Sequence, residues 1–162
     1  MKCNSSKKVQ VFWWILFIGY LIGISYFLFF SERYGRTEGT SEYRYNLVFF
    51  QEIKRFIVYH NTIGIEGFFV NLFGNVIAFM PFGFCLPTVS QSDQKLYRIL
   101  FWSFGFSLTI EIIQLVYKIG IFDVDDLFLN TIGGLLGYMC FCIIKLWKRH
   151  GGKNRVAKKR KY

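Results

Sequence analysis

The groups best suited to chemistry in this sequence are carboxylates placed in or beside long apolar runs. Asp123 and Asp126 stand just before the apolar segment 128–147. Glu111 lies inside another apolar segment, residues 96–117. A carboxylate at bilayer depth is costly to leave against acyl chains, so it must be covered by other helices or line a wet cavity. Such groups can bind a polar ligand, carry a proton, or act as general acid and base.

Amides and glycines share helical faces with these carboxylates. Residues three or four positions apart lie on one face of a helix, as Asp126, Asn130 and Gly133 do. From such faces we predict a polar ligand-binding pocket made of Asn71, Asn75, Glu111, Gln114, Asp123, Asp126 and Asn130. We predict close helix packing at Gly133, Gly134 and Gly137. The residues identify no catalytic group.

Of these residues, Glu111 most strongly indicates a function. A charged side chain at the centre of a span costs roughly 3 kcal/mol on insertion scales. That cost falls if Glu111 pairs with Lys118, which lies two helical turns further along the chain, or if it stays protonated. Amides would hold helices together at lower cost, so the carboxylate favours a functional role.

Composition places the chain among membrane proteins. Of its 162 residues 53% are hydrophobic, and the net charge of +10 comes from residues that flank apolar runs. That arrangement argues against nucleic-acid binding. The sequence has no nucleophile with an adjacent base, no phosphate-binding glycine loop and no metal-ligand spacing, so we expect no metal and no cofactor. The cluster of Asp123, Asp125 and Asp126 could hold a divalent cation, as could many inert loops. The four cysteines form no spaced framework, and we expect no disulfide.

Hydropathy predicts an all-α, polytopic membrane fold. Each long apolar run is sufficient to cross about 30 Å of hydrocarbon. The four predicted spans are residues 9–30, 67–89, 96–117 and 128–147. Residues 46–59 have helical periodicity but are short and charged, which predicts an amphipathic helix that lies along the interface or dips into it. We therefore expect a membrane domain over residues 1–147 and a disordered basic tail over residues 148–162 that is attracted to anionic lipid.

The second span contains two prolines. Pro81 removes a backbone hydrogen bond and crowds the carbonyl of Ile77, which predicts a kink. Pro87 marks the expected exit of this span from the membrane. In the first span, Gly19 and Gly23 form a small-xxx-small pair that suggests a packing face.

The distribution of basic residues predicts the topology. With both termini in the cytoplasm, 14 of the 20 lysines and arginines lie inside, which satisfies the positive-inside rule. In this orientation Asn75, Glu111 and Asp126 come from three spans and lie in the same outer slice of the membrane. Glu111 lies about 9 Å below the outer end of its span, at 1.5 Å per residue. The sequence thus predicts polar groups level with one another near the extracellular side.

Three motifs together resemble the VanZ-like family of small bacterial membrane proteins. They are NVIAFMPFGF at residues 75–84, SLTIEIIQ at residues 107–114, and DVDD at residues 123–126 followed by NTIGG and GY. The resemblance covers about residues 46 to 140. It implies a cell-envelope role in the bacterial plasma membrane, with low-level resistance to teicoplanin-type glycopeptides in the namesake of the family, and it implies no particular reaction.

Four accounts of the polar groups stay open. In the structural account, the polar side chains only form hydrogen bonds between helices, each contributing about 0.6 kcal/mol; they are Asn71, Asn75, Glu111, Gln114 and Asn130. In the binding account, which we prefer, an outward-facing pocket captures an amphiphile such as a lipoglycopeptide or a lipid-linked cell-wall precursor. In the enzymatic account, Glu111 and either Asp126 or Asp123 act as acid and base on an extracytoplasmic lipid-linked substrate. In the transport account, Glu111 carries a proton, and a homo-oligomer formed through Gly133 and Gly137 supplies further spans.

Overall fold

The computed structural model describes residues 7–30, 43–51, 54, 58, 65–90 and 95–159. The side chains of residue 30 and of residues 65–71 and 150–159 lie outside the described part of the structure. In this part of the chain the expected all-α membrane fold is confirmed. Its long helices are α1 (Lys7–Phe30), α3 (Ile65–Ser90), α4 (Leu96–Val116) and α5 (Val124–Lys159). All four are long and apolar enough to cross a membrane.

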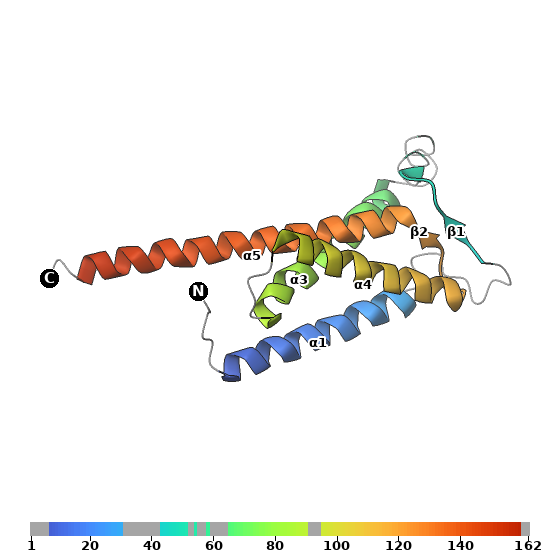
Figure 1. Ribbon diagram of the computed structural model, residues 1–162. Coiled ribbons are helices and arrows are strands. Elements are labelled where there is room, and N and C mark those ends of the chain that lie inside the picture. Colours follow the sequence, from blue (N-terminus) through green and yellow to red (C-terminus); the bar gives the residue numbers. More distant parts are fainter. Residues whose placement is uncertain are drawn as a thin grey trace.

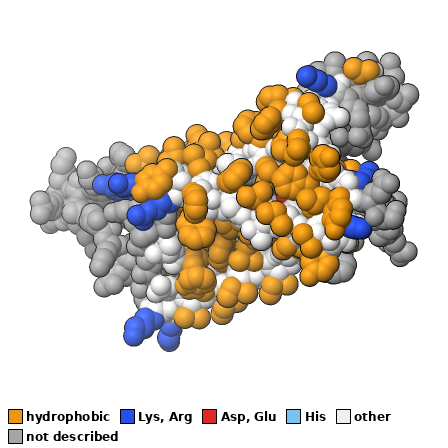
Figure 2. Space-filling model, turned by 45° about the vertical axis from the view of Figure 1, so that its right-hand side comes forward, with side chains coloured by type: hydrophobic (Ala, Val, Ile, Leu, Met, Phe, Trp, Pro, Cys, Tyr) orange, Lys and Arg blue, Asp and Glu red, His pale blue; other side chains and the backbone are white. Residues whose placement is uncertain are grey.

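The helices form a bundle, with two short strands at one end (Figure 1). The strands are β1 (Tyr45–Asn46) and β2 (Phe122–Asp123), and they pair in parallel. The start of α1 and the end of α5 lie at the opposite end of the bundle from the strands. Hydrophobic side chains are spread over the outer face of the bundle, with lysines and arginines toward its ends (Figure 2). This is the pattern of a bundle whose sides contact lipid.

Glycines set the close approach of α5 to α3. A Cβ at Gly133 would meet the carbonyl oxygen of Val76, and one at Gly137 would meet that of Met80. A Cβ at Gly83 would in turn meet the carbonyl oxygen of Gly134. Without side chains at these positions the two backbones touch, as small residues allow between membrane helices. Because this contact lies within one chain, the face that could have joined two copies is already occupied.

Aromatic side chains fill the space that remains between the helices. Phe79 has no exposed surface, and Phe82 stacks on Phe106 of α4 with ring centroids 5.0 Å apart. The first helix, α1, packs against α3, where the hydroxyl of Tyr20 donates to the carbonyl oxygen of Ala78 at 2.7 Å. A Cβ at Gly19 would meet no atom within 4 Å, so this glycine, like Gly23, does not take part in helix packing among the described residues.

The predicted helix over residues 46–59 is wrong at its start. Asn46 belongs to β1, residues 48–50 form a bend and a turn, and Phe50 has a φ of 60°. The Asn46 side chain accepts from the Val48 N–H at 3.1 Å, an arrangement that competes with helix formation. Among the described residues that follow, Gln51 and Lys54 are helical. Tertiary pairing of Asn46 with β2 therefore outweighs the local periodicity.

Helix α3 ends at Ser90, within one residue of the predicted end of this span, and Pro87 lies inside it. The end of the last helix differs from the prediction. Helix α5 runs to Lys159, beyond the other helices of the bundle (Figure 1). The expectation of disorder from residue 148 is therefore wrong as far as Lys159. Lysine and arginine are good helix formers, and no proline interrupts this stretch.

Candidate functional site

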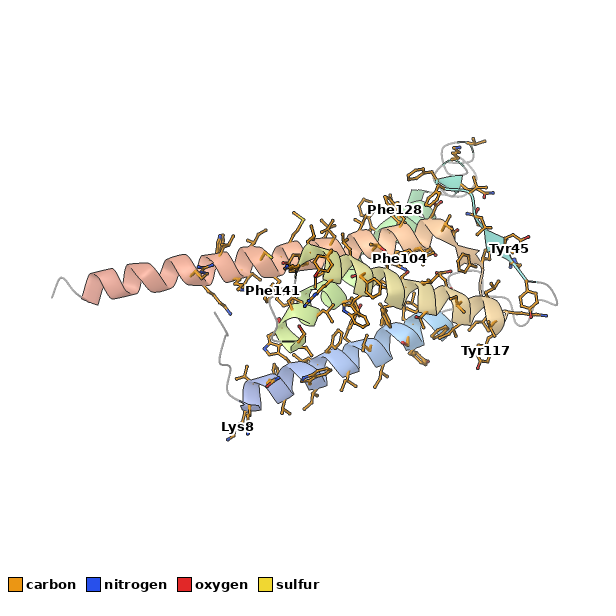
Figure 3. The ribbon with its side chains drawn as sticks, viewed as in Figure 1. Lys8, Tyr45, Phe104, Tyr117, Phe128 and Phe141 are labelled. Carbon is orange, nitrogen blue, oxygen red and sulfur yellow. The ribbon has the colours of Figure 1, made fainter. Side chains whose placement is uncertain are left out.

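The candidate site lies where α5 begins, at the end of the bundle that carries the strands. Figure 3 shows Tyr45, Tyr117 and Phe128 toward this end and Lys8 toward the other. β1 pairs with β2 so that Tyr45 lies opposite Phe122 and Asn46 opposite Asp123. The Asn46 amide donates to both carboxylate oxygens of Asp123 at 3.2 Å. The chain that follows α1 is thereby fixed to the start of α5.

Glu111 is buried, at 3% exposure, and faces the segment that leads into α5. Helix α4 ends at Val116, and Lys118 adopts a left-handed φ of 55° that turns the chain back. This reversal brings the backbone N–H of Asp123 to the Glu111 carboxylate, with a nitrogen-to-oxygen distance of 3.0 Å. The carboxylate that the sequence places inside the third span thus contacts the aspartate-rich segment.

Asp123 and Asp125 organise the N-terminus of α5. The Asp123 carboxylate accepts from the Asp125 N–H at 2.8 Å, as an N-cap side chain does. Asp125 in turn accepts from the backbone N–H of Phe50 at 2.6 Å. Negative groups at a helix N-terminus also interact favourably with the helix dipole. Both aspartates are buried, Asp123 beside Asn46 of β1 and Asp125 beneath the turn that contains Phe50.

Asp126 is the next residue of α5 after Asp125, and it faces α3. The Asn75 amide donates to its carboxylate at 2.5 Å. Asn75 is buried, whereas Asp126 is only half-buried. The structure therefore brings together, at the junction of β2 and α5, the contacts Asp123–Glu111 and Asp126–Asn75.

Below these contacts a column of polar side chains follows the α4–α5 interface. The Asn130 amide donates to the Ser107 hydroxyl at 2.9 Å, one turn toward the bundle interior from Glu111. Ser103 lies a further turn inside, against Gly134 of α5. The side chains of Ser103, Ser107 and Asn130 are all buried. We call these three residues the polar seam.

Gln114 and Lys118 each make a contact that the sequence does not predict. The Gln114 amide donates to the carbonyl oxygen of Leu28 at 3.0 Å, so it ties α4 to the end of α1. Lys118 follows the end of α4, and its ammonium lies 4.6 Å from the centre of the Tyr43 ring. Neither contact follows from the sequence, because both depend on a helix end and a loop whose positions hydropathy does not specify.

Asn71 lies on α3, but its side chain is outside the described part of the structure. Gly133 and Gly137 lie against α3, and Gly134 lies against Ser103 of α4. Within the described residues no group of three or more His, Cys, Asp or Glu side chains is arranged to hold a metal ion.

Four residues of this site are missing from the pocket that the sequence predicts: Asn46, Asp125, Ser103 and Ser107. Asn46 could not be found from local pattern, because its partner Asp123 is 77 positions away. Ser103 could have been found, since it precedes Ser107 by four positions and so lies on the same helical face. Asp125 stands out as an acid in the sequence, but its role under the Phe50 turn depends on a tertiary contact.

Comparisons with known proteins identify the family of this chain. The sequence profile of the family described as VanZ/LLP1 matches residues 17–145. Protein VanZ of Enterococcus faecium is 41% identical over 71 residues, which are 44% of this chain and 44% of VanZ. The match thus spans less than half of the length of that relative. No solved structure matches the chain. Since the profile covers most of the 162 residues and all of the described bundle core, the chain belongs to the VanZ/LLP1 family of VanZ-like membrane proteins.

Proposed function

We propose that this multi-pass membrane protein lies in the bacterial plasma membrane and lowers susceptibility to teicoplanin-type glycopeptides. It does so by holding an amphiphile, either a lipoglycopeptide or a lipid-linked cell-wall precursor, at one end of the bundle. We call this the acidic end, because it carries Glu111, Asp123, Asp125 and Asp126. The observation that supports this most directly is the convergence of polar groups from separate elements at that end. The contacts are those of Asn75 with Asp126 and of Glu111 with Asp123.

Charge supports an outward-facing position for the acidic end. Lys7 and Lys8 begin α1, and Lys148 and Arg149 close the apolar part of α5, at the opposite end of the bundle. Basic residues favour the cytoplasmic side of a membrane. With both termini in the cytoplasm, the aspartates open toward the outer leaflet, where cell-wall precursors and external antibiotics are found.

Asp126 is the carboxylate that a bound headgroup would reach first. It is half-buried, whereas Asp123 and Asp125 are buried under the strand and turn that precede α3. A carboxylate accepts hydrogen bonds from hydroxyl and ammonium groups, which occur on sugars and peptides. The Asn75 amide fixes its orientation toward such a group.

An apolar surface for the acyl chain adjoins the same aspartates. Leu47, Val48 and Phe49 are exposed one after another on the turn that covers Asp125. Phe50 contacts Phe128 of α5 edge to face, with ring centroids 6.0 Å apart. Consecutive exposed apolar side chains typically mark an interaction surface. Polar and apolar groups therefore adjoin at this end, as an amphiphile requires.

The test is teicoplanin susceptibility in cells that express the protein at matched membrane levels. We expect Asp126→Asn and Glu111→Gln each to return the inhibitory concentration to that of cells without the protein. Thr109→Val is the control, because Thr109 is exposed on α4 and donates to the Gly105 carbonyl of its own helix at 2.8 Å. Unchanged resistance in both carboxylate variants would remove the proposal.

A further inference from the structure

The polar seam contains two buried polar atoms that no other atom of the described residues satisfies. They are the hydroxyl oxygen of Ser103 and the carboxamide oxygen of Asn130. Ser103 has no exposed surface and Asn130 has 3%. Buried polar atoms are normally hydrogen-bonded, either to protein or to an ordered water.

The Ser103 hydroxyl behaves differently from the hydroxyls of three threonines on these helices. Thr88, Thr109 and Thr131 each donate to the carbonyl oxygen four positions earlier in their own helix, at 3.3, 2.8 and 2.7 Å. Such a bond satisfies a hydroxyl that has no other partner. Ser103 makes no such bond and instead lies against Gly134 of α5. Its hydroxyl is directed into the interface between α4 and α5.

The register of the two antiparallel helices brings the two atoms to adjacent levels. Asn130 pairs with Ser107, and one turn further inside Gly134 faces Ser103. Four residues of helix rise about 6 Å. One water molecule that bonds to both atoms at about 2.8 Å spans nearly that distance. The Ser107 hydroxyl, already bonded to Asn130, offers a third partner.

We propose that the polar seam binds a single structural water molecule, held by Ser103, Asn130 and Ser107. A buried water needs two to four polar partners, and these three residues supply them. The water donates to the Asn130 oxygen and accepts from the Ser103 hydroxyl, and so extends the contact between Asn130 and Ser107 one turn further toward the middle of the bundle.

The seam ends at this water. Ile99, one turn inside Ser103 on α4, has no exposed surface. Because Ile99 is the next position on this face of α4, the inner end of the seam is apolar. The site therefore takes one water molecule and does not belong to a file of waters across the membrane.

Infrared difference spectroscopy tests the site without any ligand. Purified protein in lipid is measured in ordinary water and in water of heavy oxygen, and a buried water gives an O–H band that shifts with the isotope. We expect a shifting band that is lost in Ser103→Ala and kept in Thr109→Val. A spectrum without this band, or a band that Ser103→Ala retains, would overturn the proposal.

Unfolding in detergent gives a second, independent measurement. Ser103→Ala should raise the unfolding equilibrium constant by roughly five- to thirtyfold, the effect of leaving a buried polar atom unpaired. In an Asn130→Leu background the same substitution should change the constant by less than about twofold, because the water has already lost its acceptor. Equal effects in both backgrounds contradict a shared water. A direct bond between the two residues would give coupling without the infrared band, which also overturns the proposal.

Discussion

At the scale of single residues, each carboxylate of the acidic end is held by a donor from another part of the chain. Asp126 contacts Asn75 of α3, Asp123 contacts Asn46 of β1, and Glu111 accepts from the backbone of β2. These bonds are what a purely structural role requires. The proposed ligand binding would add a further role for the same oxygens, and variants that keep the fold and change the charge separate the two roles.

Replacement of Asn75, whose amide donates to Asp126, tests the structural role of this contact. Asn75→Leu keeps the volume but leaves the partly buried carboxylate without this donor, which should lower the free energy of unfolding by about 1–3 kcal/mol. Reversible unfolding in detergent measures the change. Thr109→Val, at an exposed position, should stay within about 0.5 kcal/mol of the wild type. Equal stability of Asn75→Leu and wild type would show that this contact contributes nothing to the fold.

Glu111→Gln tests whether Glu111 serves only the fold or also the function, through its contact with the Asp123 N–H. A glutamine oxygen can still accept from the Asp123 N–H, so the free energy of unfolding should change by no more than about 1 kcal/mol. The negative charge, however, is lost. We expect a folded protein, shown by an unchanged elution profile, that no longer confers teicoplanin resistance. Retained resistance would favour a purely structural role for Glu111.

At the scale of helices, glycine positions decide how closely α5 approaches α3. Gly137→Ala would drive a methyl group into the carbonyl oxygen of Met80, and overpacking of this kind costs about 1–3 kcal/mol. Gly19→Ala is the matched control, since its methyl would meet no atom within 4 Å and alanine favours the helix. Detergent unfolding of both variants should show a loss only for Gly137→Ala. A comparable loss in Gly19→Ala would contradict this assignment of the packing glycines.

The helices could be predicted from sequence because each depends on a long apolar run, which is a local property. Predicted and observed spans agree within a few residues, for example 96–117 against Leu96–Val116. β1 and β2 could not be predicted. Each contains two residues, too few for an alternating pattern, and their pairing joins Asn46 to Asp123 across 77 positions.

The depth of the polar groups in the membrane could be predicted from sequence. Their hydrogen-bond partners could not. Helical spacing and topology indicate that Asn75, Glu111 and Asp126 share a depth. Which amide contacts which carboxylate depends on helix rotation and on the path of the connecting loops. That is why Gln114, on the expected face, bonds to α1 at Leu28.

At the scale of the whole molecule, the orientation in the membrane is the first prediction. Single cysteines placed at Tyr43 and at Lys148, in a protein without its native cysteines, should react differently with an impermeant maleimide on intact cells. We expect labelling at position 43 only, and labelling of both in permeabilised cells, because the proposed orientation puts the basic end in the cytoplasm. The reverse pattern would place the aspartates inside and exclude an external ligand.

The enzymatic and transport alternatives make different whole-molecule predictions. An enzyme that uses Glu111 with Asp126 or Asp123 would leave a chemically altered antibiotic or wall precursor, which mass spectrometry of cells with and without the protein would detect. A transporter would move its cargo in response to a pH gradient and lose this response in Glu111→Gln. A protein that only binds its amphiphile leaves these molecules unaltered and shows no gradient dependence, and this is the result that we expect.

The measurement that tests amphiphile binding most directly is a titration of the purified protein in lipid nanodiscs with teicoplanin and, separately, with a lipid-linked cell-wall precursor. We expect saturable binding of at least one of them by wild type and by Thr109→Val. The affinity should be weaker by about tenfold or more in Asp126→Asn, the effect of losing a charge-assisted hydrogen bond of about 1.5–3 kcal/mol. Failure of both molecules to bind, or equal affinity in Asp126→Asn, would contradict a ligand site at the acidic end.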